Sequence, residues 1–299
     1  MTEKIEEQRL AASLALRIER LCGTQIFGAR RVTMGYGATQ RWLVDTVSGS
    51  RYFVKVGVTP PSIDALRHEA SVYERFRLRC MPAVVAWEDN EKSPILVLED
   101  LSGLEWPPAW SEETVGKALA LIDTVHASSG PLLSYEERNG TEWDWWRAVE
   151  REPEGFLRLN ITTPEWLRSS LPALIKYAAS VSPTGSAVGH FDLRSDNFCF
   201  SRDEARLVDW SLACLGNAKL DLGLFLPCLA AEHGLSPESV LPNEPGIAAW
   251  VAGFFAWHAG KPVIPTAPGV RVLQQKLLRA ALPWVTNELG LQDHGRPWA

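Results

Sequence analysis

The pattern of apolar and polar residues divides the chain in two, with mostly strand-like segments before about residue 100 and helical segments after it. Segments rich in β-branched and aromatic residues predict strands, and Ser48-Gly49-Ser50 between two of them predicts a hairpin turn. The strands expected in this part are 39–47, 51–56, 83–87 and 95–98. Helices are expected over 3–22 and 62–79, where apolar residues recur at helical spacing.

The second half of the chain is expected to be largely helical. The helices expected there are 112–127, 164–181, 221–233, 245–259 and 269–289. Residues 131–155 are rich in tryptophan and are expected to be irregular. Strands followed by helices predict an α+β, bilobal fold, in which an N-terminal lobe of antiparallel sheet plus helix (1–100) precedes a larger, mostly helical C-terminal lobe (101–299). A cleft is expected between the two lobes.

Composition and charge exclude several classes of protein. The chain has 299 residues and a net charge of -6, whereas nucleic-acid binders are usually basic, so no nucleic-acid partner is expected. No apolar run approaches the ~20 residues of a membrane span, so no membrane partner is expected either. The five cysteines are scattered and form no C-x-x-C pair, which indicates reduced thiols and a cytoplasmic location.

One polar segment carries the pattern expected of phosphoryl transfer. His190, Asp192 and Asn197 fall in the order H-x-D-x-x-x-x-N, and Asp209 follows the apolar run Leu207-Val208 twelve residues later. Asp192 is predicted to orient and deprotonate an attacking hydroxyl, while Asn197 and Asp209 offer hard oxygen ligands to Mg²⁺. Arg194 is predicted to place a guanidinium near the transferred phosphate, and His190 to hold the loop by hydrogen bonding. The alternative is a loop whose polar side chains only satisfy backbone groups.

Lys55 is the candidate for the phosphates of the nucleotide, ATP or GTP. It interrupts an apolar strand, and alternation places it on the same face as Phe53. Glu69 lies on or beside the apolar face of the helix expected over 62–79, and a carboxylate in that position requires a cation. Lys55 and Glu69 are therefore predicted to pair, with Glu74 as the alternative partner for Lys55.

Two further segments are candidates for nucleotide contacts. Gly35 and Gly37 form a G-x-G loop one hairpin before Lys55, where backbone N–H groups would face phosphates; a plain hairpin turn is the alternative. Glu99 to Leu101 follow an apolar strand, where a backbone carbonyl and N–H would meet the adenine edge; a simple connector is the alternative. The tryptophan-rich segment 142–146 is expected to pack in a core, or else to form a cage for an ammonium group or sugar.

With these residues together, the chain resembles the aminoglycoside phosphotransferase family, small-molecule kinases with a protein-kinase-like fold. The resemblance rests on Gly-His-Phe-Asp-Leu-Arg-Ser-Asp-Asn (189–197), on Leu-Val-Leu-Glu-Asp-Leu-Ser-Gly (96–103) and on Thr-Val-His-Ala (124–127). Phe191 stands where the family usually has glycine. The resemblance implies that Asp221 is structural and holds the catalytic loop.

The resemblance implies an ATP- or GTP-dependent O-phosphotransferase that uses Mg²⁺ and acts on a small hydroxylated molecule, cationic or sugar-bearing, with a role in antibiotic resistance. Two alternatives remain. One is a metabolic kinase for choline, ethanolamine or homoserine, and the other is a pseudokinase that binds nucleotide without turnover.

Overall fold

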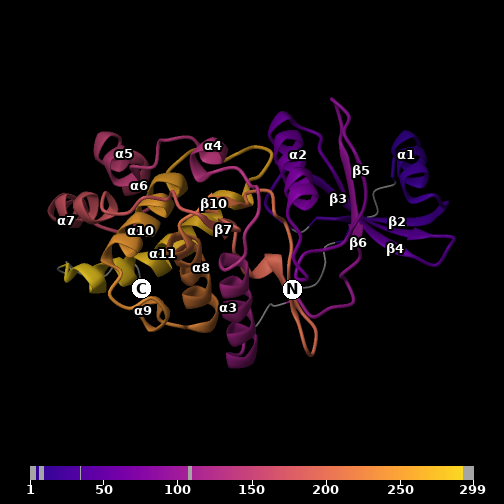
Figure 1. Cartoon of the computed structure of the whole chain (residues 1–299). Coiled ribbons are helices and arrows are strands. Elements are labelled where there is room, and N and C mark those ends of the chain that lie inside the picture. Colours follow the sequence, from indigo (N-terminus) through magenta and orange to yellow (C-terminus); the bar gives the residue numbers. More distant parts are fainter. Residues whose placement is uncertain (1–4, 7–9, 34, 107–109, 292–299) are drawn as a thin grey trace.

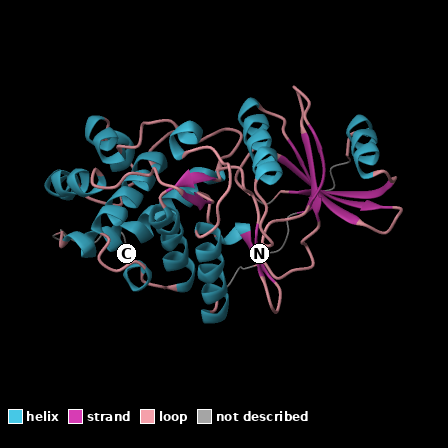
Figure 2. Ribbon diagram, in the orientation of Figure 1, coloured by secondary structure: helices cyan, strands magenta, loops and turns pink. Residues whose placement is uncertain are grey.

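The computed structural model describes residues 5–6, 10–33, 35–106 and 110–291. Figure 1 shows a sheet with two flanking helices, formed by the first hundred residues, beside a larger part that is mostly helical. Figure 2 shows the same division by secondary structure, with most strands gathered at one end of the molecule. The α+β architecture expected from the sequence is therefore confirmed.

The N-terminal part is built on one antiparallel sheet in the order β1-β2-β3-β4-β6-β5. The strands are β1 (Ile5–Glu6), β2 (Ile26–Val32), β3 (Gln40–Thr46), β4 (Arg51–Val56), β5 (Val84–Glu88) and β6 (Ile95–Glu99). The hairpin of β3 and β4 and the strands β5 and β6 follow the expectation within one or two residues. Strand β2 was not expected.

Two helices, α1 (Ala12–Cys22) and α2 (Pro60–Arg75), lie on opposite sides of this sheet (Figure 1). The expected helix over 3–22 is wrong at its start, because Ile5–Glu6 is a strand; residues 3–4 and 7–9 lie outside the described residues. Helix α2 begins where Thr59 and Ser62 form a reciprocal cap, each hydroxyl accepting a hydrogen bond from the other residue's backbone N–H. This start fixes the position of Glu69 further along the same helix.

The two faces of the β3–β4 hairpin serve different purposes. Val44 and Val54 lie on one face and pack with Ile18 of α1 in a small apolar core. On the other face, Arg41 lies opposite Lys55 and Leu43 opposite Phe53. The pleat of the hairpin therefore directs two cations toward the rest of the chain.

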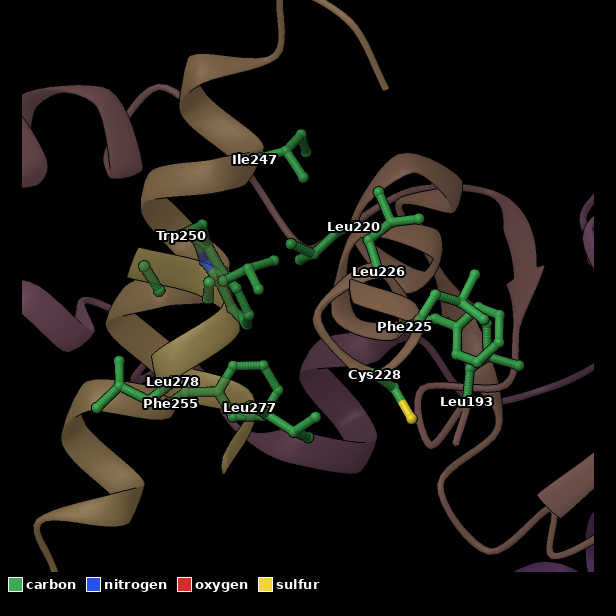
Figure 3. Close-up of a cluster of buried hydrophobic side chains, with 14 of the residues drawn as sticks. Leu193, Leu220, Phe225, Leu226, Cys228, Ile247, Trp250, Phe255, Leu277 and Leu278 are labelled. Atoms are coloured by element: carbon green, nitrogen blue, oxygen red, sulfur yellow. The ribbon is translucent and has the colours of Figure 1, made fainter. Parts of the chain in front are cut away.

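The C-terminal part packs around helix α10. Its helices are α3 (Glu112–His126), α4 (Tyr135–Asn139), α5 (Trp145–Arg151), α6 (Glu154–Leu157), α7 (Pro164–Ala178), α8 (Ala218–His233), α9 (Pro237–Val240), α10 (Pro245–Ala259) and α11 (Gly269–Leu289). Most residues of α10 are buried, and Figure 3 shows its side chains among those of α8 and α11. The expected helices are confirmed, with small shifts at their ends. Residues 131–155, expected to be irregular, instead contain α4, α5 and the start of α6.

The tryptophans of segment 142–146 belong to this helical core. Trp146 is fully buried and donates a hydrogen bond from Nε1 to the Ala249 carbonyl at 2.7 Å. Trp145 packs edge-on against Trp250 and Phe254 of α10. For these two indoles, the expectation of core packing is confirmed. Within the part of the chain that the structure describes, no helix has the length and apolar character needed to cross a membrane.

Candidate active site

The loop after β7 (Ala187–Gly189) is held by one buried carboxylate. Asp221, at the start of α8, accepts hydrogen bonds from the backbone N–H groups of His190 at 2.9 Å and Phe191 at 2.6 Å. His126, at the end of α3, lies with Nε2 2.9 Å from Asp221 Oδ2. Asp221 therefore joins two helices to the backbone that carries Asp192.

His190 is buried and fixes the same loop from within. Its Nε2 donates to the Val208 carbonyl at 3.1 Å, while its Nδ1 accepts from the backbone N–H of Asp192 at 3.3 Å. These two contacts require the neutral ring with the proton on Nε2. Burial lowers the pKa of His190 to about 4, so the ring stays neutral at physiological pH.

Phe191 adopts a backbone conformation that favours glycine, with φ of 55°. Its ring lies against two glycines, since a Cβ at Gly189 or Gly216 would come within about 2.5 Å of ring atoms. Tyr135 packs against the ring at a centroid distance of 5.1 Å. An aromatic residue is therefore accommodated where the resemblance leads us to expect glycine, because Asp221 holds its backbone and two glycines make room for its ring.

Asp192 lies in a network with Arg194 and Asn197. Arg194 Nη1 is 3.1 Å from Asp192 Oδ1, and the Asn197 carboxamide donates to the Asp192 carbonyl at 2.7 Å. Arg194 also pairs with Asp196 at 3.0 Å, and its guanidinium lies 5.2 Å from the ring centroid of Tyr36 in the glycine loop. Burial raises the pKa of Asp192 to about 7, against the opposing charge of Arg194. A carboxylate with this pKa can accept a proton near neutral pH.

The second half of the site joins the two parts of the chain. Lys55 Nζ is 2.8 Å from both carboxylate oxygens of Glu69 and 3.1 Å from Asp209 Oδ1. The predicted pairing with Glu69 is present, and Asp209 is added from the other part of the chain. Burial alone would lower the pKa of Lys55, but Asp209 and Glu69 outweigh it and raise that pKa. Burial would also raise the pKa of Asp209, yet Lys55 and Arg41 hold it well below its usual range, so Asp209 is ionised.

A cleft of about 470 Å³ lies between these groups. Residues from both parts of the chain line it, and they include most of those predicted from the sequence: Gly35, Lys55, Glu99, Leu101, Arg194, Asn197 and Asp209. Glu69 and Asp192 do not line the cleft themselves; Glu69 pairs with Lys55, and Asp192 pairs with Arg194, and both partners do line it. Gly37 lines an adjoining cavity of about 380 Å³, between the glycine loop and the start of α11. Of the backbone expected to meet adenine, Glu99 has its side chain turned to Arg206 and to the backbone N–H of Ala83.

Several lining residues were not identified from the sequence, and Arg41 is foremost among them. Its Nη2 lies 3.6 Å from Asp209 Oδ2, on the other side of that carboxylate from Lys55. The signal was partial. The expected turn over 48–50 pairs Leu43 with Lys55, two residues away from the observed register, but alternation still places Arg41 on the same face as Lys55. Arg30 and Arg51 also line the cleft, so it contains several cationic side chains besides Lys55.

Asn197 and Asp209 are suited by chemistry to a magnesium ion. The Asn197 carboxamide nitrogen is engaged with Asp192, which leaves its oxygen as a neutral donor, and Asp209 provides an anionic one. The backbone N–H of Val208 donates to the Asn197 carbonyl at 2.9 Å, so the residues before Asp209 are held beside Asn197. The described residues contain no cluster of three or more His, Cys, Asp or Glu that would enclose a metal. Two oxygen donors with open positions match the way Mg²⁺ binds beside phosphates.

Comparisons with known proteins bear on the family and the fold of the chain. A sequence model of the phosphotransferase enzyme family (APH) matches residues 28–263. No curated protein matches the chain. Among solved structures, an aminoglycoside phosphotransferase from Alicyclobacillus acidocaldarius is similar with a TM-score of 0.55 and 13% identity, over 95% of this chain and 96% of that one. This likeness shows the kinase-like fold that the sequence led us to expect.

Two other solved structures have lower scores. A choline kinase from Cryptosporidium parvum gives a TM-score of 0.49 at 9% identity, over 88% of each chain. A macrolide 2'-phosphotransferase type I gives 0.48 at 15% identity, over 99% of this chain and 100% of that one.

Proposed function

The chain belongs to the phosphotransferase enzyme family, and from that membership we propose that it transfers the γ-phosphoryl group of ATP or GTP to a hydroxyl of a small molecule. One observation carries the proposal. Lys55, on β4, is bonded both to Glu69 of α2 and to Asp209 of the opposite part of the chain, so a cation and the carboxylate predicted to bind a metal meet in one cleft. This arrangement is the one that phosphoryl transfer from a nucleotide requires.

The acceptor side of the reaction falls to the loop of Asp192. Asp192 accepts the proton of the attacking hydroxyl and orients its oxygen toward the phosphorus. Arg194, which pairs with Asp192, stabilises the charge that develops on the transferred group. Asn197 holds the Asp192 carbonyl and keeps the loop in register.

The nucleotide side falls to residues of both parts. Lys55, oriented by Glu69, contacts the α- and β-phosphates, and the loop of Gly35 and Gly37 covers them with backbone N–H groups. The Glu99 carbonyl and the Leu101 N–H meet the purine edge. Asn197 and Asp209 would hold a magnesium ion, which would supply positive charge beside the phosphates. Residues 1–100 thus form the nucleotide-binding lobe, and residues 101–299 the catalytic and acceptor-binding lobe.

The acceptor we propose is a small hydroxylated molecule that is cationic or bears a sugar. A panel assay tests it: ADP release is measured with aminoglycosides, macrolides, choline, ethanolamine and homoserine in the presence of Mg²⁺ and ATP or GTP. We expect turnover with one class and background with the others. Turnover with an antibiotic supports a role in resistance, and turnover with choline, ethanolamine or homoserine supports a metabolic kinase instead.

A binding measurement separates the kinase proposal from its acceptor. We expect Mg²⁺ with ADP or GDP to raise the melting temperature of the protein, because a ligand that binds only the folded state stabilises it. No shift with either nucleotide at millimolar concentration would contradict nucleotide binding altogether. A shift without turnover on any acceptor would favour a pseudokinase.

A further inference from the structure

Arg41 lines the cleft, but neither the H-x-D-x-x-x-x-N motif nor the glycine loop gives it a role. It lies on β3 directly opposite Lys55, so the two side chains project from the same face of the hairpin. Its Nη2 is 3.6 Å from Asp209 Oδ2, and its side chain is only 12% exposed. A guanidinium and an ammonium therefore share one carboxylate.

The glycine loop is built around this guanidinium. Gly35 has φ of 96°, and a Cβ there would lie 3.1 Å from the Arg41 Cζ and 3.2 Å from both terminal nitrogens. Arg41 Nη1 donates a hydrogen bond to the Thr39 carbonyl of the same loop at 3.1 Å. Glycine at position 35 thus lets the loop backbone lie directly on Arg41, where the loop is expected to cover phosphates.

The two cations beside Asp209 are not equally fixed. Lys55 is tied to Glu69 by two hydrogen bonds of 2.8 Å, and Glu69 is only 1% exposed. Arg41 is held by a 3.6 Å ion pair to Asp209 and by one carbonyl. Moving Arg41 away from Asp209 therefore breaks less than moving Lys55, and it leaves Asp209 with an oxygen free for a metal ion.

We propose that Arg41, which pairs with Asp209 in this structure, is a phosphate-binding residue that turns to the β- and γ-phosphates when a nucleotide binds. A guanidinium presents two parallel N–H groups, which suit phosphate oxygens better than a single ammonium does. Its departure makes Asp209 available to Mg²⁺ at the moment when the phosphates arrive. This inference rests on the proposed nucleotide site and adds the residue that exchanges a carboxylate for phosphate.

The test compares three affinities in Arg41→Gln: the affinity for ADP should fall, the affinity for Mn²⁺ should rise, and the affinity for AMP serves as the reference. In Arg41→Gln, the dissociation constant for ADP, measured by calorimetry without metal, is expected to rise roughly 10- to 100-fold. The constant for AMP, which lacks the β-phosphate, is expected to change less than about threefold. Mn²⁺ binding to the nucleotide-free protein, measured by paramagnetic resonance, is expected to tighten, because Asp209 has lost a competing cation.

Two further variants make the result decisive. Arg30 lies on β2 opposite Leu43 and also lines the cleft, so Arg30→Gln removes the same charge from the same cleft. This variant is expected to keep the wild-type ratio of ADP affinity to AMP affinity. Arg41→Lys keeps the charge without the forked geometry of the guanidinium. Its dissociation constant for ADP is expected to lie between those of the wild type and Arg41→Gln. It also provides the comparison if Arg41→Gln folds poorly.

Opposite results overturn the proposal. Equal losses for AMP and ADP in Arg41→Gln would assign Arg41 a structural role in the hairpin. Weaker Mn²⁺ binding in that variant would show that Arg41 supports the metal site and does not compete with it. If wild-type protein binds neither ADP nor AMP, the proposed function itself fails, which is a distinct outcome.

Discussion

Replacing Asp192 with asparagine is expected to lower kcat by about 10²- to 10⁴-fold while the dissociation constant for ADP changes less than about threefold. Asparagine has the same shape, but its carboxamide does not accept the proton of the acceptor hydroxyl. Asp192 lies behind Arg194 and outside the lining of the nucleotide cleft, so nucleotide affinity should persist. The measurement is steady-state ADP release with the acceptor found in the panel, beside calorimetry with ADP.

The matched control for this variant is Asp196→Asn. Asp196 is the other carboxylate bonded to Arg194, at 3.0 Å, so its replacement removes the same charge from the same guanidinium. We expect Asp196→Asn to keep most of the turnover. Wild-type turnover in Asp192→Asn would exclude Asp192 as the base, and equal losses in both variants would assign the effect to Arg194.

The pH dependence of the rate is expected to report the same carboxyl group. Burial raises the pKa of Asp192 to about 7, so kcat/KM should rise as pH increases toward 7 and level off above it. An ordinary aspartate, with a pKa near 3.9, would give a flat profile over this range. A flat profile between pH 5.5 and 8 would therefore contradict a buried Asp192 as base.

Stability is a poorer probe of Asp192 than the rate. A raised carboxyl pKa contributes stability that is present below the unfolded value, near 3.9, and is lost as pH rises through about 7. His190 acts in the opposite direction: burial lowers its pKa to about 4, so its contribution is lost as pH falls from about 6.5 toward 4. Because the two ranges overlap, the melting temperature mixes both groups.

The residues that sequence reasoning identified were those whose constraints are local. Lys55 on an apolar strand and Glu69 on an apolar helix face each need a partner, and fourteen residues of chain bring them together. The spacing of Asp192 and Asn197 lies within one loop. The contact between Lys55 and Asp209, by contrast, joins residues far apart in the sequence, and hydrophobic periodicity does not predict such contacts. The motif and the family resemblance were needed to predict that these residues share one site.

Where expectation failed, tertiary packing outweighs local pattern. Strand β2 contains Gly28 and two adjacent arginines, so its sequence lacks the apolar run that marks β4. Helices α4, α5 and α6 have four to seven residues each, too short for a helical period to appear. Packing stabilises them instead: Trp145 and Trp146 dock α5 on α10, and Tyr135 of α4 packs against Phe191. Arg41 was not identified because its role depends on a contact with Asp209, which lies far away in the sequence.

Replacing Asp221 with alanine is expected to lower the free energy of unfolding by about 3–5 kcal/mol and to reduce kcat as well. Asp221 is 1% exposed and accepts hydrogen bonds from two backbone N–H groups, and each would be left buried without a partner at about 1–3 kcal/mol. Phe191 adds to this, because its left-handed backbone costs about 1–3 kcal/mol and persists only where the surroundings hold it. The loop that carries Asp192 should therefore loosen. Urea unfolding measures the first effect, and amide hydrogen exchange at residues 190–192 measures the second.

His126→Leu separates the loop from the helix that reaches the same carboxylate. It removes the contact from His126 Nε2 but leaves both backbone N–H groups of the loop bonded to Asp221. We expect a smaller loss, about 1–2 kcal/mol, with hydrogen exchange at 190–192 close to wild type. If His126→Leu is as costly as Asp221→Ala, the two helices matter more than the loop. Unchanged exchange in Asp221→Ala would show that packing of the Phe191 ring alone holds Asp192 in place.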